Sequence, residues 1–159
     1  MKTSAFRLFC FILAIAFSSC KKDSNDPAPG NSSLGTFVGN IQVVDDPQTQ
    51  LGYIYNAEVS VTTSGSDATV KITGDPGFER EYTGKVTTRQ DGLYDITLSK
   101  QTKPAEKVAG ERVVIINNKL TISLDVANDN VTVRKNTTTN ETLQITGKIS
   151  MIGTDMLIK

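Results

Sequence analysis

The side chains available for chemistry in this chain are carboxylates, hydroxyls and tyrosines, because the sequence has no histidine and its only cysteines are Cys10 and Cys20. The absence of histidine excludes Ser-His-Asp and Cys-His nucleophiles and haem held by an imidazole. Since both cysteines lie near the N-terminus, the rest of the chain cannot form a zinc site of His and Cys ligands or an internal disulfide. The sequence also lacks a Walker loop and a GxGxxG motif. We therefore expect no enzyme of these classes, no cofactor and no metal.

Paired carboxylates are the remaining route to catalysis. Glu79 and Glu81 lie two residues apart on a predicted strand, so their side chains point to the same face. Glycoside hydrolysis needs two carboxylates across a cleft, and a carboxylate-dependent enzyme acting on glycans is the weak alternative for this chain. The neighbouring Arg80 and Lys85 favour instead a solvated, charged face.

Two tyrosines are the candidate ligand-binding residues. Tyr53 and Tyr55 alternate on one face of a predicted strand, where they could stack on a sugar or line a cavity for an apolar ligand. Packing in the core or at its rim is the alternative role. The chain has no tryptophan, which disfavours a typical carbohydrate-binding module.

The N-terminal segment has the features of a signal peptide. Lys2 and Arg7 precede ten consecutive apolar residues, 8–17, and the chain then reads Ser18-Ser19-Cys20. This apolar run is about half of the roughly 20 residues that a transmembrane helix needs. We therefore expect residues 1–19 to be a signal peptide that is removed.

The cleavage region Phe17-Ser18-Ser19-Cys20 resembles the lipobox of bacterial lipoproteins. The resemblance implies that Cys20 carries a lipid and anchors the protein to a membrane, and several acyl chains would make that anchor effectively permanent. The continuation Cys20-Lys21-Lys22-Asp23 is similar to the start of mature lipoproteins of Bacteroidota-type bacteria, and Lys21 in second place implies the outer membrane, with the periplasmic or the surface-facing leaflet left open. Ordinary secretion after residues 14–16 is the alternative.

A short polar segment follows the predicted anchor. Residues 21–33 have Ala28 as their only apolar side chain apart from prolines and a glycine, so we expect residues 20–33 to be the lipidated cysteine and a flexible tether. Removal of residues 1–19 takes away Lys2 and Arg7 and no acid, which leaves fifteen basic and seventeen acidic side chains, a net charge of −2. Because no basic field remains to neutralise phosphates, we expect no nucleic-acid partner.

Residues 34–159 are predicted to form one β-domain, because short runs rich in Val, Ile and Thr alternate with turn signals at roughly the 8–12-residue spacing of antiparallel sheets. The clearest hairpin turns at Asn117-Asn118, since asparagine tolerates the positive φ of a type I′ turn. A two-residue loop there sets Ile115 opposite Leu120 and Val113 opposite Ile122, and those four side chains should share the buried face. The pattern predicts about eight to ten strands in meander order.

A second hairpin is centred on residues 90–92. A three-residue loop with Gly92 in the left-handed region pairs Val86 with Ile96 and Thr88 with Tyr94, which brings apolar residues together better than a two-residue loop does.

Three glycines fall in the middle of predicted strands. Gly39, Gly84 and Gly147 lie inside such runs, and glycine relieves crowding where a strand bends sharply, as at the corners of a barrel.

Gly35-Thr36-Phe37 lies where lipocalins have Gly-x-Trp. On this motif and the hairpin order, residues 34–159 resemble the small calycin or lipocalin-like barrels of lipoproteins from Bacteroidota-type bacteria. The resemblance implies an all-β, single antiparallel meander barrel, and a β-sandwich is the alternative fold. The leading functional hypothesis is a non-enzymatic, membrane-anchored lipoprotein that binds a small apolar or amphipathic ligand. The alternative is a structural or interaction lipoprotein of the cell envelope whose barrel is filled and whose partner is an envelope protein.

Overall fold

The computed structural model describes residues 30–45, 49–136 and 138–159. In these ranges the chain forms eight β-strands. Buried and more exposed residues alternate along much of their length, as expected of strands whose side chains point to opposite faces in turn. The strands are β1 (Ser32–Asp45), β2 (Thr49–Ser64), β3 (Asp67–Asp75), β4 (Phe78–Gln90), β5 (Leu93–Lys103), β6 (Lys107–Ile116), β7 (Lys119–Arg134) and β8 (Asn140–Ile158).

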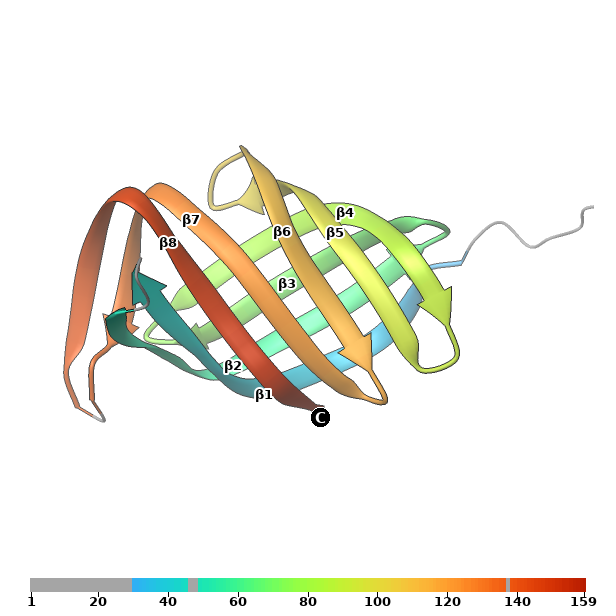
Figure 1. Cartoon of the computed structure of the whole chain (residues 1–159), viewed down its shortest axis with the longest axis horizontal. Helices are drawn as coiled ribbons and strands as arrows, with labels where there is room; N and C mark the ends of the chain where they lie inside the picture. The colour runs from blue at the N-terminus through green and yellow to red at the C-terminus, as the bar shows by residue number, and fades with distance from the viewer. Residues whose placement is uncertain (1–29, 46–48, 137) are drawn as a thin grey trace, which may run out of the picture.

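The eight strands form one closed antiparallel barrel (Figure 1). Each strand pairs with the next along the chain, and β8 returns to pair with β1, where Phe37 lies opposite Ile158. The prediction of an all-β, single meander barrel is confirmed, and the β-sandwich alternative is not the fold. Closure pairs the first strand with the last, so neither is left as the edge strand of an open sheet.

The hairpin around Asn117 and Asn118 forms as predicted. Both asparagines have positive φ, 49° and 63°, and the register sets Ile115 opposite Leu120. Val113 pairs with Ile122 in the same ladder, and all four apolar side chains are buried.

The hairpin between β4 and β5 has a different register from the predicted one. Gln90 pairs with Leu93, so the loop has two residues, and Gly92 has the expected positive φ of 73°. Val86 does lie opposite Ile96, but Thr88 pairs with Asp95 and not with Tyr94. The extra residue sits in a β-bulge near Thr87 instead of in the loop, and the bulge restores the apolar pairing further along the strand.

The barrel interior is filled by apolar side chains from strands all around it. The largest that are fully buried are Tyr82, Phe37, Ile41, Ile54, Ile72, Ile96, Leu98, Leu120, Ile122, Leu124, Met151 and Met156. Charged residues alternate with them on the outer face, where ion pairs join neighbouring strands, such as Asp95 with Arg112 and Asp125 with Lys148. The inward apolar and outward charged pattern explains why the sheet closes around its own side chains.

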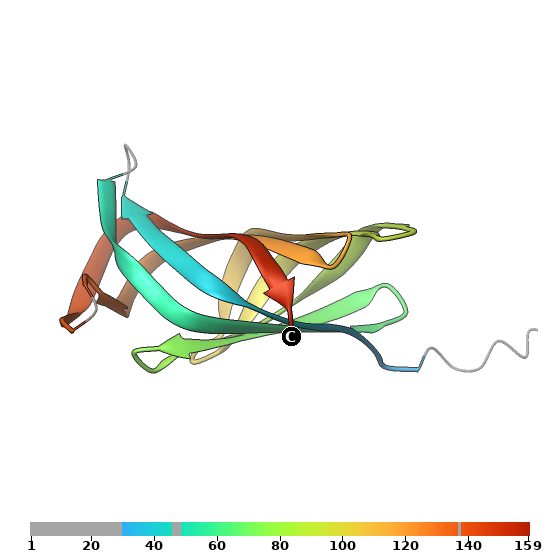
Figure 2. The ribbon, with the colours of Figure 1, turned by 90° about the horizontal axis from the view of Figure 1, so that it is seen from below.

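At one end of the barrel, two hairpins extend beyond the wall and meet. Figure 2 shows the hairpin of β1 and β2 and the hairpin of β7 and β8 at the same end of the barrel, and Tyr53 of β2 pairs there with Arg134 of β7. The approach is close, because a Cβ on Gly52 would lie 2.7 Å from Cγ2 of Val133. A glycine is therefore required where the two hairpins touch.

The three mid-strand glycines predicted to mark bends all lie at irregularities in the ladders. The β1–β2 register shifts just after Gly39, the β4–β5 register shifts at Gly84, and Gly147 is one of two residues opposite the shift in β7. Such bulges increase the local bend of a strand.

Candidate functional site

The two tyrosines predicted to bind a ligand lie on the outer face of the barrel. The residues that alternate with them, Gly52 and Ile54, are buried. The rings of Tyr53 and Tyr55 are tilted by 38° with centroids 5.4 Å apart, and the Arg134 guanidinium lies 6.0 Å from the centroid of the Tyr55 ring. The Tyr53 hydroxyl donates a hydrogen bond of 3.3 Å to Oε1 of Gln50. The pair thus belongs to the junction of the two hairpins and does not line the interior, while its role in ligand binding stays a prediction.

The predicted lipid anchor, Cys20, lies outside the described residues, as do the predicted signal peptide and most of the tether. The anchor therefore stays a prediction.

The carboxylates of Glu79 and Glu81 share the outer face of β4, as their spacing predicts. Glu81 lies 3.5 Å from the Nζ atoms of both Lys71 and Lys103 and accepts a hydrogen bond of 3.0 Å from Thr102 Oγ1. The Thr102 hydroxyl and the two lysines lower the pKa of Glu81. This carboxylate is held ionised in a charged surface network.

The most unusual chemistry lies inside the barrel, where polar side chains from β4, β5, β6 and β7 interrupt the apolar interior. Arg80, Tyr82 and Glu111 are 7%, 1% and 6% exposed. Gln101, opposite Tyr82, is also buried. Burying such groups is unfavourable unless each finds a partner. We call Arg80, Tyr82, Gln101, Glu111 and Asp129 the interior polar cluster.

Only part of the interior polar cluster is paired. Nη2 of Arg80 lies 3.3 Å from Oδ2 of Asp129, and Nη1 donates a hydrogen bond of 2.9 Å to the carbonyl oxygen of Glu79. Nε of Arg80, the hydroxyl of Tyr82 and Oε2 of Glu111 have no hydrogen-bond partner among the described residues. These three atoms are a donor, a group that both donates and accepts, and an acceptor. Each could pair with the polar group of a bound molecule.

The two acids of the cluster have pKa values shifted in opposite directions, upward for Glu111 and downward for Asp129. Burial raises the pKa of Tyr82, and the nearby Glu111 raises it further. Burial also raises the pKa of Glu111, against the effect of backbone amides at 110 and 111. For Asp129, burial is outweighed by the Lys107 ammonium, the amide of Asn130 and Arg80, so its pKa is lowered. Asp129 is therefore the charged acid of the cluster and Glu111 the one that more readily holds a proton.

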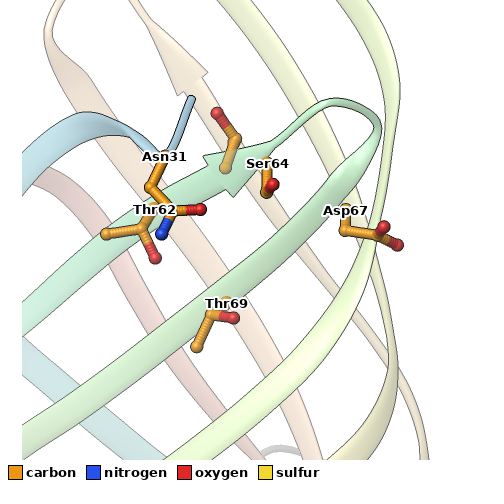
Figure 3. Close-up of a pocket in the computed structure, with 6 residues that line it drawn as sticks. Asn31, Thr62, Ser64, Asp67 and Thr69 are labelled. Carbon is orange, nitrogen blue, oxygen red and sulfur yellow. The ribbon is translucent and has the colours of Figure 1, made fainter. Parts of the chain in front are cut away.

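A separate shallow hollow of about 190 Å³ lies at the turn between β2 and β3 (Figure 3). It is lined by hydroxyl and amide side chains and one carboxylate, on Asn31, Thr62, Thr63, Ser64, Asp67 and Thr69. The Asp67 carboxylate is ion-paired with Lys85. The hollow offers hydrogen bonds near the entry of the chain into β1 but no buried, unpaired group, so it is the weaker candidate.

The interior polar cluster follows from the alternation of β4 and β6, although sequence reasoning did not single it out. If Glu79 and Glu81 face outward, then Arg80 must face inward. Likewise, placing Val113 on the buried face puts Glu111 on that face as well. The sequence pattern that indicates the cluster is therefore a charged residue at a position where the alternation of the strand places a side chain inside the barrel.

Comparison with protein-family models, with curated proteins and with solved structures found no match for this chain. The described part of the chain contains no helix with the length and apolar character that a membrane crossing requires. It also contains no group of three or more His, Cys, Asp or Glu side chains that could hold a metal ion.

Proposed function

We propose that this protein is a non-enzymatic lipoprotein of the bacterial cell envelope, anchored to the outer membrane through Cys20, whose barrel docks a partner protein. The filled interior is the observation that favours docking over carriage of a small ligand. Carriers of small molecules leave a cavity of several hundred Å³ inside the barrel or cleft. Here the facing strands meet through large, fully buried side chains such as Phe37, Ile96 and Leu124.

The outer surface offers apolar contact area that a partner could cover. Ile116 and Leu157 are half exposed, and both flank Lys119 in one row across β6, β7 and β8. Leu157 also pairs with Val38 of β1, which extends the row. Apolar residues that gather on an outer surface often mark an interaction site.

The anchor supports this role because a lipid at the N-terminus would hold the barrel beside other envelope proteins at high effective concentration. The lipobox-like Phe17-Ser18-Ser19-Cys20 carries this part of the proposal. Replacing Cys20 with Ala should move the full chain from the membrane pellet to the released fraction; retention of the variant in the pellet would contradict the anchor.

Site-specific photo-crosslinking in living cells of the host tests the docking role. A photoreactive residue at position 108 or 157, both exposed, should crosslink to a discrete protein, and the same residue at the exposed Thr97 serves as the control. Equal, diffuse crosslinking at all three positions would count against a docked partner.

A further inference from the structure

The barrel wall is only partly paired between β6 and β7. Their ladder runs from Arg112 opposite Ser123 to Ile116 opposite Lys119. Among the described residues, no ladder joins Lys107–Glu111 of β6 to Asp125–Asn130 of β7, although each stretch is paired on its other side. Figure 1 shows the two strands side by side near their shared turn and separating toward the opposite end. We call the stretch between these two unpaired edges the seam.

Bulges on both strands explain why the pairing stops. Val108 and Glu111 of β6 pair with Lys100 and Leu98 of β5. Two residues lie between the β6 pair and only one between the β5 pair, so β6 has a bulge here. On β7, Asn128 has a φ of 50° and lies within a register shift toward β8. Because bulges bend strands and end ladders, the two edges diverge here.

A single lysine spans the seam. Nζ of Lys107 on β6 lies 3.1 Å from Oδ2 of Asp129 and donates a hydrogen bond of 3.4 Å to the carbonyl oxygen of Asn128. Both partners are on β7. The ammonium group thus links the two strands where no backbone ladder of the described residues joins them. On the same edge the Val108 side chain is 96% exposed, so it projects from the surface beside the lysine.

The interior polar cluster reaches both strands that border the seam, through Glu111 of β6 and Asp129 of β7. Glu111 ends the unpaired stretch of β6, and Asp129, within the unpaired stretch of β7, contacts Arg80. Tyr82 lies two residues after Arg80 on the same buried face of β4. All three side chains with unpaired atoms are more than nine-tenths buried.

We propose that the seam accepts an extended segment of a partner protein, which adds a strand between β6 and β7 and presents a neutral polar side chain to the interior polar cluster. This inference rests on the proposed docking function and names the kind of partner. An extended backbone offers alternating donors and acceptors at the repeat that both unpaired edges require. An amide or hydroxyl side chain both donates and accepts, so it can pair with a donor such as Arg80 Nε or with an acceptor such as Glu111 Oε2.

Selection of random peptides displayed on phage against the purified full chain tests the proposal. Enriched peptides should be β-prone with a central Asn, Gln, Ser or Thr, and synthetic versions should slow hydrogen exchange of amides in residues 107–111 and 125–130. Methylation of alternate peptide nitrogens should abolish binding, since strand addition depends on the backbone. No enriched peptide, protection confined to another surface, or binding that survives methylation of either alternate set would overturn the proposal.

Three variants separate strand addition from general surface binding. Lys107→Gln removes the group that spans the seam and should tighten peptide binding by roughly twofold to fivefold. Lys100→Gln is the matched control. It breaks the ion pair between Lys100 and Glu106, which does not cross the seam, and should leave binding unchanged. Tyr82→Phe should weaken binding by roughly threefold to tenfold, because it removes one of the interior hydrogen bonds. Equal effects of the two lysine variants would contradict the seam.

The outcome is distinguishable from failure of the docking function. Crosslinks to a host protein from position 157 but not from position 108 would leave docking intact and refute the seam. Pairing of position 108 with a second copy of this chain would replace the proposed partner with self-association and overturn the inference.

Discussion

At the scale of the residue, the decisive feature is the contrast between an apolar interior and three buried polar atoms that have no hydrogen-bond partner within residues 30–45, 49–136 and 138–159. Arg80, Tyr82 and Glu111 keep desolvated groups in a place where apolar side chains would be more stable. Folding alone does not explain why these groups are there. A role in binding would explain it, because a partner's polar group would satisfy atoms that the free barrel leaves unpaired.

Tyr82→Phe tests that view in the free protein. The substitution keeps the ring in the core and removes a hydroxyl that has no partner, so the free energy of unfolding should stay the same or rise by up to about 1 kcal/mol. Urea unfolding of the full chain measures it. A loss of more than about 1 kcal/mol would mean that the hydroxyl is bonded in the free state.

Glu111 should make stability depend on pH in a direction opposite to that of ordinary surface acids. Burial raises its pKa above the ordinary 4.5, so the folded state binds the proton more tightly than the unfolded state does. The contribution of Glu111 to the free energy of unfolding is therefore greatest below 4.5 and falls as the pH rises through the folded pKa.

Urea unfolding of wild type and Glu111→Gln across this range measures the effect. The difference in unfolding free energy between the two should shift in favour of the variant as the pH rises. Glu79→Gln, on the exposed face of β4, is the control. A difference that stays constant with pH would show that Glu111 is not desolvated.

At the scale of the element, glycines decide where the strands can bend. A Cβ on Gly84 would lie 2.1 Å from the carbonyl oxygen of Thr97, whereas nothing lies within 4 Å of a Cβ on Gly147. Both glycines sit at register shifts in similar local sequences, Thr83-Gly84-Lys85 and Thr146-Gly147-Lys148. The first is required by close contact between neighbouring backbones, and the second is not.

Gly84→Ala should therefore lower the free energy of unfolding by about 3 kcal/mol, because backbone must move to admit the methyl group. Gly147→Ala should change it by less than about 1 kcal/mol, since the added methyl group meets no neighbour and restricts the unfolded chain. Chemical unfolding of both variants decides between them. Similar losses would contradict the distinction.

Much of the element scale could be predicted from the sequence, because local rules act there. Turn chemistry at Asn117-Asn118 and alternation in the flanking strands led to the correct pairing of Val113 with Ile122. At Asp91-Gly92 the same rules chose the wrong loop, since a bulge inside β4 could supply the extra residue just as well. Where the two hairpins meet, Tyr53 lies beside Arg134 through long-range geometry that no local pattern encodes.

The candidate site was less predictable for the same reason. The inward direction of Arg80 and Glu111 follows from alternation, but their meeting inside one barrel depends on closure and on the bulges that bend β6 and β7. The absence of hydrogen-bond partners is a property of the assembled interior. Tyr53 and Tyr55 were visible as a pair in the sequence, yet which face they occupy depends on the register of the whole barrel.

At the scale of the whole molecule, the protein is a closed barrel whose interior is packed with apolar side chains and whose wall is incompletely paired at the seam between β6 and β7. The apolar filling favours the outer surface and the seam as the places where another molecule binds. A predicted lipid at Cys20 would hold this body at the envelope, where a partner protein would meet it.

Native mass spectrometry of the full chain, extracted from its host in mild detergent, tests the filled barrel most directly. The account predicts the mass of residues 20–159 with acyl groups at Cys20 and no retained small molecule. A small molecule bound at one copy per barrel, and released only on unfolding, would contradict it.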